Sequence, residues 1–272
     1  MISLILIGFK YAPNKKTTTP LPGVSLDINR IIEHYKGRIS NAIILSNIKS
    51  VKFNMSRDDD NDDDDLRPFK RSSKSEIYKH RKTNIMYNYV SDAPSLLHHI
   101  KKYCKYNERN NRVIVYYSGH GRKGNMMLPN DTRLSFSFLL NTLVRAINVP
   151  SVHKKLLVIA DCCDPGTFDL PYKFSSDGTR VSLTSTCSEY MNNKNVSCMV
   201  VTSASITNKA ITHYENASFF TCVLLEQFRQ NNINIDAIRR VIKARSKQIG
   251  HYQIMSCYTS ERTKPFLWSW CC

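Results

Sequence analysis

Short apolar runs alternate with amphipathic helical stripes along most of this chain, and the alternation restricts the folds open to it. The runs are rich in Val, Ile and Leu, which is typical of strands that are covered on both faces. We expect strands at Leu4–Ile7, Ala42–Leu45, Val113–Tyr117, Leu156–Ala160, Met199–Thr202 and Tyr252–Tyr258.

Between these runs, apolar residues recur at i, i+3, i+4 and i+7, so each stripe has one face to bury against a sheet. Such stripes begin at Ile28, Ala93 and Phe136, and two further helices are expected near 217–228 and 235–249. Strands that alternate with helices predict an α/β fold, a three-layer sandwich in which a mostly parallel central sheet carries helices on both faces.

The 272 residues show no internal repeat, so we expect one domain over 1–272. Residues 46 to about 84 are polar and charged, with an aspartate run at Asp58–Asp65 and a basic stretch at Arg67–Lys82, and we expect a flexible surface insertion there. The apolar start Met1–Gly8 has no basic leader and resembles a first strand, so no prodomain is expected.

The formal net charge is +17, which favours binding to polyanions. No nucleic-acid-binding motif accompanies the charge, so we attribute it to a Lys- and Asn-rich surface and expect no nucleic-acid or membrane partner. Nine cysteines without a regular framework indicate reduced thiols and a cytoplasmic location. A weak nuclear signal in Arg67–Lys82 is the alternative. No cysteine or histidine spacing predicts a metal site.

Two motifs each follow a predicted strand. Val113–Tyr117 leads into Ser118-Gly-His120-Gly121, and Leu156–Ala160 leads into Asp161-Cys-Cys163. Functional groups collect at the carboxyl ends of parallel strands, so a histidine and a cysteine there predict a thiol nucleophile with its base. Read separately, each motif is equally compatible with a loop histidine or an inert core thiol.

A histidine at this position can accept the thiol proton and then protonate a leaving amine. His120 lies between two glycines, so a substrate carbonyl could approach closely. The backbone N–H groups of Gly121 and Cys163 would then form the oxyanion hole. The pattern favours a cysteine hydrolase.

These blocks resemble those of the caspase-like cysteine peptidases, and of the metacaspases most closely. Metacaspases carry Tyr-Ser-Gly-His-Gly, matched here by Tyr117–Gly121, and an Asp-Ser/Cys-Cys block, matched by Asp161–Cys163. By this resemblance the catalytic pair is His120 and Cys163, not Cys162. Leu21–Asp27 and Phe219–Glu226 are similar to two further metacaspase segments.

The resemblance also implies a specificity. Metacaspases place acidic residues and a serine around the S1 pocket, and the matching positions here are Asp27, Ser118 and Asp161. Two carboxylates in a partly dehydrated pocket favour a guanidinium or ammonium group. We therefore expect an endopeptidase that cleaves proteins or peptides after Arg or Lys. Basic residues in the loop after Cys163 (Lys173, Arg180 and Lys194) and in Arg67–Lys82 are candidate self-cleavage sites.

The chain departs from the metacaspase pattern at two positions that follow the nucleophile. Asp164 replaces a histidine and Pro165 a serine, and like-charge repulsion from Asp164 would oppose thiolate formation. The acidic segment of calcium-dependent metacaspases is missing after His120-Gly121, so no cofactor and no calcium dependence is expected. A catalytically inactive caspase-like scaffold that binds a protein partner is the alternative function.

Overall fold

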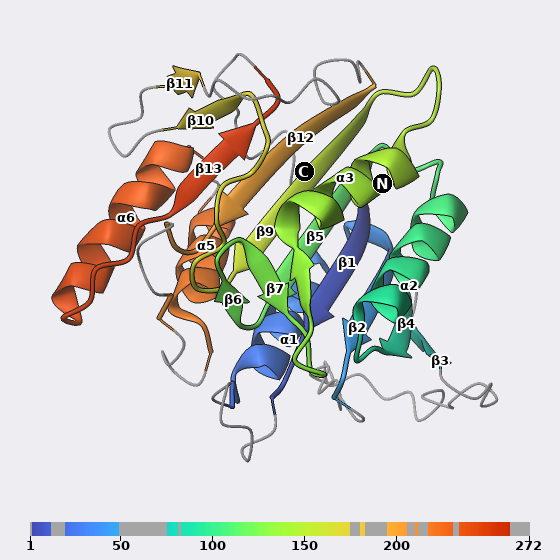
Figure 1. Ribbon diagram of the computed structural model, residues 1–272, viewed down its shortest axis with the longest axis horizontal. Coiled ribbons are helices and arrows are strands. Elements are labelled where there is room, and N and C mark those ends of the chain that lie inside the picture. Colours follow the sequence, from blue (N-terminus) through green and yellow to red (C-terminus); the bar gives the residue numbers. More distant parts are fainter. Residues whose placement is uncertain are drawn as a thin grey trace.

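The computed structural model describes residues 2–11, 20–48, 75–80, 83–174, 180–182, 195–205, 210–211, 217–230 and 234–261. Its centre is one large sheet with the strand order β11-β10-β13-β12-β9-β5-β1-β2-β4-β3 (Figure 1). Strands β12, β9, β5, β1, β2 and β4 are adjacent in that order and parallel to one another. Strands β13, β10, β11 and β3 pair antiparallel with the strands beside them. The parallel strands are β1 (Ile2–Gly8), β2 (Ile39–Ser46), β4 (Thr83–Tyr89), β5 (Arg112–Ser118), β9 (Lys154–Asp161) and β12 (Val196–Thr202).

The described helices cover both faces of this sheet. Helices α2 and α3 pack together, whereas α1 contacts α5 and α5 contacts α6. The connection through α1 runs from β1 to β2, whereas the connections through α2 and α3 run in the opposite direction along the sheet, from β4 to β5 and from β5 to β9. Because right-handed crossovers in opposite directions place their helices on opposite faces, α1 lies across the sheet from α2 and α3. In Figure 1, α3 lies in front of the sheet. The helices are α1 (Val24–Tyr35), α2 (Ala93–Tyr106), α3 (Phe136–Ile147), α5 (Phe219–Arg229) and α6 (Ile235–Gln248).

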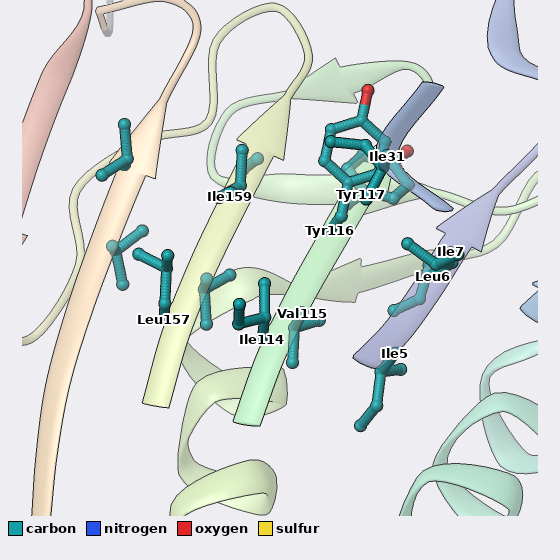
Figure 2. Close-up of a cluster of buried hydrophobic side chains, with 14 of the residues drawn as sticks. Ile5, Leu6, Ile7, Ile31, Ile114, Val115, Tyr116, Tyr117, Leu157 and Ile159 are labelled. Atoms are coloured by element: carbon teal, nitrogen blue, oxygen red, sulfur yellow. The ribbon is translucent and has the colours of Figure 1, made fainter. Parts of the chain in front are cut away.

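The core strands are buried on both faces, which explains their unbroken apolar sequences. Figure 2 shows side chains of β1, β5 and β9 in one cluster, together with Ile31 of α1. Every residue of β1 is buried. Removing such side chains from water contributes about 25 cal/mol per Å² of apolar surface, so these strands carry much of the free energy of folding. The predicted α/β sandwich with helices on both faces is confirmed.

The predicted flexible insertion at 46 to about 84 is wrong at its carboxyl end. Strand β3 (Ser75–His80) pairs antiparallel with β4, and β4 pairs parallel with β2, so this part of the chain extends the sheet. A polar strand is tolerated here because β3 is the last strand of the sheet and has one open edge. The aspartate run Asp58–Asp65 lies outside the described residues.

Further strands form where the sequence indicated only loops. A three-stranded sheet follows β5 and consists of β6 (Gly121–Arg122), β7 (Asn125–Met127) and β8 (Arg133–Ser135). After β9, strands β10 (Tyr172–Phe174) and β11 (Arg180–Ser182) continue the main sheet beyond β13 (Ser256–Thr259). The last strand therefore begins four residues later than the predicted Tyr252. None of the described helices is long and apolar enough to cross a bilayer.

Candidate active site

The two motifs lie side by side because their strands are neighbours. Strands β5 and β9 are parallel and in register, with their last residues, Ser118 and Asp161, directly paired. His120 and Cys163 each follow two residues later, so both leave the sheet at the same edge. The Gly119 N–H donates to the Asp161 carbonyl at 3.3 Å and continues the strand pairing beyond the ladder.

Gly121 brings the histidine loop into contact with the cysteine loop. A Cβ atom at this position would overlap the Cys163 carbonyl oxygen and the Cys162 Sγ atom. Only glycine allows the two backbones to approach so closely. The packing of Gly121 against the nucleophile segment therefore holds the His120 loop next to the Cys163 loop. Figure 1 shows the β6–β7 hairpin beside the ends of β5 and β9.

Two tyrosines hold the backbone of His120. The Tyr11 hydroxyl accepts from the His120 N–H at 3.1 Å, and the Tyr117 hydroxyl donates to the His120 carbonyl at 2.7 Å. Tyr11 also donates to the Met127 carbonyl at 2.8 Å. Its ring lies against the imidazole, with centroids 4.5 Å apart. Burial raises the pKa of Tyr11 to about 12, so its hydroxyl keeps its proton at neutral pH.

The two adjacent cysteines differ in exposure. Cys162 is only 2% exposed, and burial raises its pKa well above the usual thiol value, with the charges of Asp161, Cys163 and Asp164 adding to the shift. Cys163 is partly exposed, and its Sγ accepts a hydrogen bond from the Ala210 N–H at 3.3 Å. A sulfur near solvent that accepts a hydrogen bond is better suited to nucleophilic attack than a buried sulfur.

The three predicted S1 residues meet beneath the histidine and the cysteine. Ser118 donates to Asp27 Oδ2 at 2.9 Å, and Ser118 is the ladder partner of Asp161. Asp27 comes from α1, where it lies in the first turn, and Asp161 ends β9. Both carboxylates are buried, at 3% and 5% exposure.

The amino-terminal end of α5 supplies donors to this carboxylate pair. The Ser218 N–H donates to Asp27 Oδ1 at 2.8 Å, and the Thr221 hydroxyl donates to Asp161 Oδ2 at 2.6 Å. Tyr116 in turn contacts the Thr221 hydroxyl at 2.7 Å. Helix amino termini favour negative charge, so α5 stabilises the ionised form of both acids.

Burial works against that ionised form. Burial, together with the charge of Asp161, raises the pKa of Asp27 to about 7, although the Ser218 and Ser118 donors and the charge of Arg30 act in the opposite direction. Burial also raises the pKa of Asp161, against the donors that surround it. Two like charges in a dehydrated site resist joint ionisation, so the pair is partly protonated near pH 7.

Two short stretches of the predicted loop after Cys163 are strands of the main sheet. Lys173 lies within β10, which pairs with β11 on one side and β13 on the other, and its ammonium group lies 5.3 Å from the Tyr258 ring centroid. Cleavage after Lys173 would require this part of the sheet to open, so it is a poor self-cleavage site. Arg180 lies in β11. Lys194 and most of Arg67–Lys82 lie outside the described residues.

A family model described as the caspase domain matches residues 58–267 of this chain. The chain belongs to the caspase domain family. This family is that of the cysteine peptidases of the caspase clan, which act on protein substrates. The metacaspase subtype stays a prediction.

Solved structures extend the similarity of this caspase-family chain to its amino-terminal part. The crystal structure of caspase-1 from Spodoptera frugiperda matches with a TM-score of 0.56 at 11% identity, covering 95% of this chain and 85% of that chain. At this identity the match shows the fold alone. No curated protein matches the chain. Asp27 precedes the residues matched by the family model.

Sequence reasoning missed several residues of this caspase-family site. Tyr11 lies three residues beyond the end of β1, at the same sheet edge as His120, so its position along the chain was a usable signal. Thr221 lies in the Phe219–Glu226 segment that carried part of the metacaspase resemblance. Nothing in the sequence marks Ala210, because its role comes only from the contact of its backbone N–H with the Cys163 sulfur. Among the described residues, no cluster of His, Cys, Asp and Glu could hold a metal ion.

Proposed function

We propose that this chain is an endopeptidase that hydrolyses peptide bonds after Arg or Lys, with Cys163 as nucleophile and His120 as general base and acid. One observation carries the proposal. The loops of His120 and Cys163 pack together at the ends of β5 and β9, directly above a buried pair of carboxylates. A non-catalytic domain has no evident need for that combination.

In the proposed reaction, His120 takes the Cys163 proton and the thiolate attacks the carbonyl carbon of the scissile bond. The carbonyl oxygen becomes an oxyanion, for which the Gly121 and Cys163 N–H groups are the proposed donors. The protonated imidazole gives its proton to the leaving amine as the C–N bond breaks. Water, activated by His120, then hydrolyses the thioester and restores the thiol. The two tyrosines on the His120 backbone support a fixed position for the imidazole throughout these steps.

The preference for a basic P1 residue follows from charge. A guanidinium or ammonium group that reaches Asp27 and Asp161 releases the retained proton and forms an ion pair with two carboxylates. An aspartate side chain at the same place would add a third acid to a buried cluster, which is strongly unfavourable. Ser118, which donates to Asp27 and pairs with Asp161 across neighbouring strands, completes the proposed pocket.

The test is hydrolysis of fluorogenic peptides that differ only at P1, with Arg, Lys, Gln or Asp. We expect cleavage of the Arg and Lys peptides, loss of at least about 1,000-fold in kcat in Cys163→Ala and His120→Ala, and activity within about fivefold of wild type in Cys162→Ala. Cys162 is a matched control because it is the neighbouring cysteine and is buried. Cleavage of the Asp peptide in preference to the Arg peptide would overturn the proposed specificity.

An inactive scaffold is the second candidate function, and Asp164 with Pro165 beside the nucleophile favours it. An irreversible acyloxymethyl ketone probe with Arg at P1 separates the two. The peptidase proposal requires covalent labelling of wild type that disappears in Cys163→Ala. A folded wild type that neither hydrolyses the peptides nor takes up the probe is an inactive scaffold.

A further inference from the structure

The hairpin that begins directly after His120 ends in a tight turn. Strands β6 and β7 are joined by Lys123 and Gly124, which have φ angles of +48° and +75°. Positive φ at both central residues is the pattern of a type I′ turn. Successive N–H groups in such turns form a small concave site that accepts an anion.

Two oxygen atoms of Asp164, the residue after Cys163, accept hydrogen bonds from this turn. Its carboxylate Oδ2 accepts from the Lys123 N–H at 2.8 Å, and its backbone carbonyl accepts from the Gly124 N–H at 3.1 Å. A φ of +41° turns Asp164 so that its side chain and its carbonyl both reach the turn. Aspartate tolerates this left-handed conformation better than most residues.

Other contacts fix the remaining sides of the turn. Gly166 packs against Gly124 so closely that a Cβ atom on Gly166 would overlap the Gly124 Cα. The Gly124 carbonyl accepts from the Phe136 N–H at 3.0 Å, at the start of α3. The turn is thus held by α3 on one side and by the nucleophile segment on the other.

We propose that Asp164 is a positioning residue that clamps the Cys163 segment to the His120 hairpin and so sets the approach of sulfur to imidazole. This inference rests on the proposed roles of Cys163 and His120. It reverses the expectation from sequence, in which Asp164 counted against catalysis because of its charge. The carboxylate is used as the hydrogen-bond acceptor for the Lys123 amide, and this contact explains why an acid stands at this position.

Charge repulsion and clamping predict opposite results for one substitution. Asp164→Asn removes the charge but keeps a carbonyl oxygen that can accept from the Lys123 N–H. If repulsion dominates, the variant gains thiolate and becomes faster. If clamping dominates, it stays close to wild type, and Asp164→Ala, which removes the acceptor, becomes slow.

The experiment compares Asp164→Asn, Asp164→Ala and Asp164→Gly with wild type. We expect kcat within about threefold of wild type for Asn, and lower by about 10- to 100-fold for Ala and Gly with KM changed by less than about threefold, because small displacements of reacting groups cost rate. The glycine variant removes any backbone strain at φ +41°, so a low rate in both Ala and Gly assigns the loss to the missing acceptor. Asp169→Ala, an exposed acid of the same loop, is the control for loss of one negative charge and should match wild type.

A second readout needs no activity. Hydrogen exchange of the peptide that contains Lys123 and Gly124, followed by mass spectrometry, should be faster in Asp164→Ala than in wild type or Asp164→Asn. Unchanged exchange in Asp164→Ala overturns the clamp, as does equal kcat in the Asn and Ala variants or a faster Asn variant. If wild type itself cleaves nothing while exchange still depends on the acceptor at 164, the clamp stands and the proposed peptidase function fails.

Discussion

The hydroxyl of Tyr11 accepts a hydrogen bond from the backbone N–H of His120 at 3.1 Å, and the tyrosine ring lies against the imidazole. The two residues are more than a hundred positions apart in sequence and lie just beyond the ends of the neighbouring strands β1 and β5. Together with Tyr117 on the His120 carbonyl, Tyr11 holds the proposed catalytic histidine by its main chain. The two backbone hydrogen bonds and the ring contact therefore all act on the His120 loop.

Replacing Tyr11 by phenylalanine should therefore slow catalysis without weakening substrate binding. The ring remains, but the His120 N–H loses its acceptor and the Met127 carbonyl loses its donor, which costs roughly 1–3 kcal/mol of stability. We expect kcat to fall about 10-fold with KM within about twofold. Tyr106→Phe, at a residue 74% exposed, is the matched control and should change neither value. A rise in KM at constant kcat would place Tyr11 in substrate binding instead.

Binding of a basic side chain should strengthen as pH rises. Asp27 has a pKa raised to about 7 by burial and by Asp161, so below that pH the pocket is partly protonated and attracts a cation less. The inhibition constant of benzamidine, a guanidinium-like cation that does not titrate in this range, should fall between pH 6 and pH 8. An inhibition constant independent of pH would show that no carboxylate in this pKa range contacts the cation.

The same shift predicts that Asp27 destabilises the folded chain at high pH. Its pKa is near 7 when folded and 3.8 otherwise, so between these values the folded state binds more protons and the free energy of unfolding falls as pH rises. Asp27→Asn should therefore raise Tm at pH 8 by about 3 °C or more relative to wild type, and by less at pH 5, where Asp27 is already neutral when folded. The variant should also lose cleavage of Arg peptides. Equal Tm differences at both pH values would contradict the assigned shift.

Thr221 should tune the same pocket through Asp161. In Thr221→Val the donor to Asp161 Oδ2 disappears while the shape is kept, so the pKa of Asp161 rises further and the affinity for benzamidine at pH 7 should fall about 5- to 20-fold. Thr221→Ser retains the hydroxyl and should restore most of the affinity. A serine variant as weak as the valine variant would mean that the methyl group, not the hydroxyl, is what matters.

Chelation of calcium should leave the proposed activity unchanged. The segment Arg122–Asp131, which follows the histidine, carries one acidic residue, Asp131, whereas calcium sites need several oxygen ligands. Hydrolysis of an Arg peptide in 1 mM EGTA and in 1 mM CaCl₂ should differ by less than about twofold. A calcium-dependent increase of tenfold or more would show that the chain uses calcium through residues outside this segment.

The regular part of the fold was readable from the sequence. Strands β1, β5 and β9 are apolar along most of their length because both faces are covered, and helices α1, α2 and α3 have stripes that match one buried face. The Asp92 side chain caps α2 by accepting from the Ser95 N–H at 2.8 Å. Such features depend on local periodicity and local hydrogen bonding, which neighbouring residues determine.

Strands β3, β10 and β11 were not readable, because a polar segment becomes a strand only when a sheet edge is there to pair with it. The candidate site divides in the same way. His120, Cys163 and the S1 acids followed from strand ends and a family resemblance, which are properties of the linear chain. The rest of the site depends on which loops meet at the carboxyl ends of the strands, and it comprises Tyr11, Ala210, Thr221 and the clamp at Asp164. Such meetings are decided by tertiary packing, since hydrogen bonds between distant segments leave no pattern in the sequence around either partner.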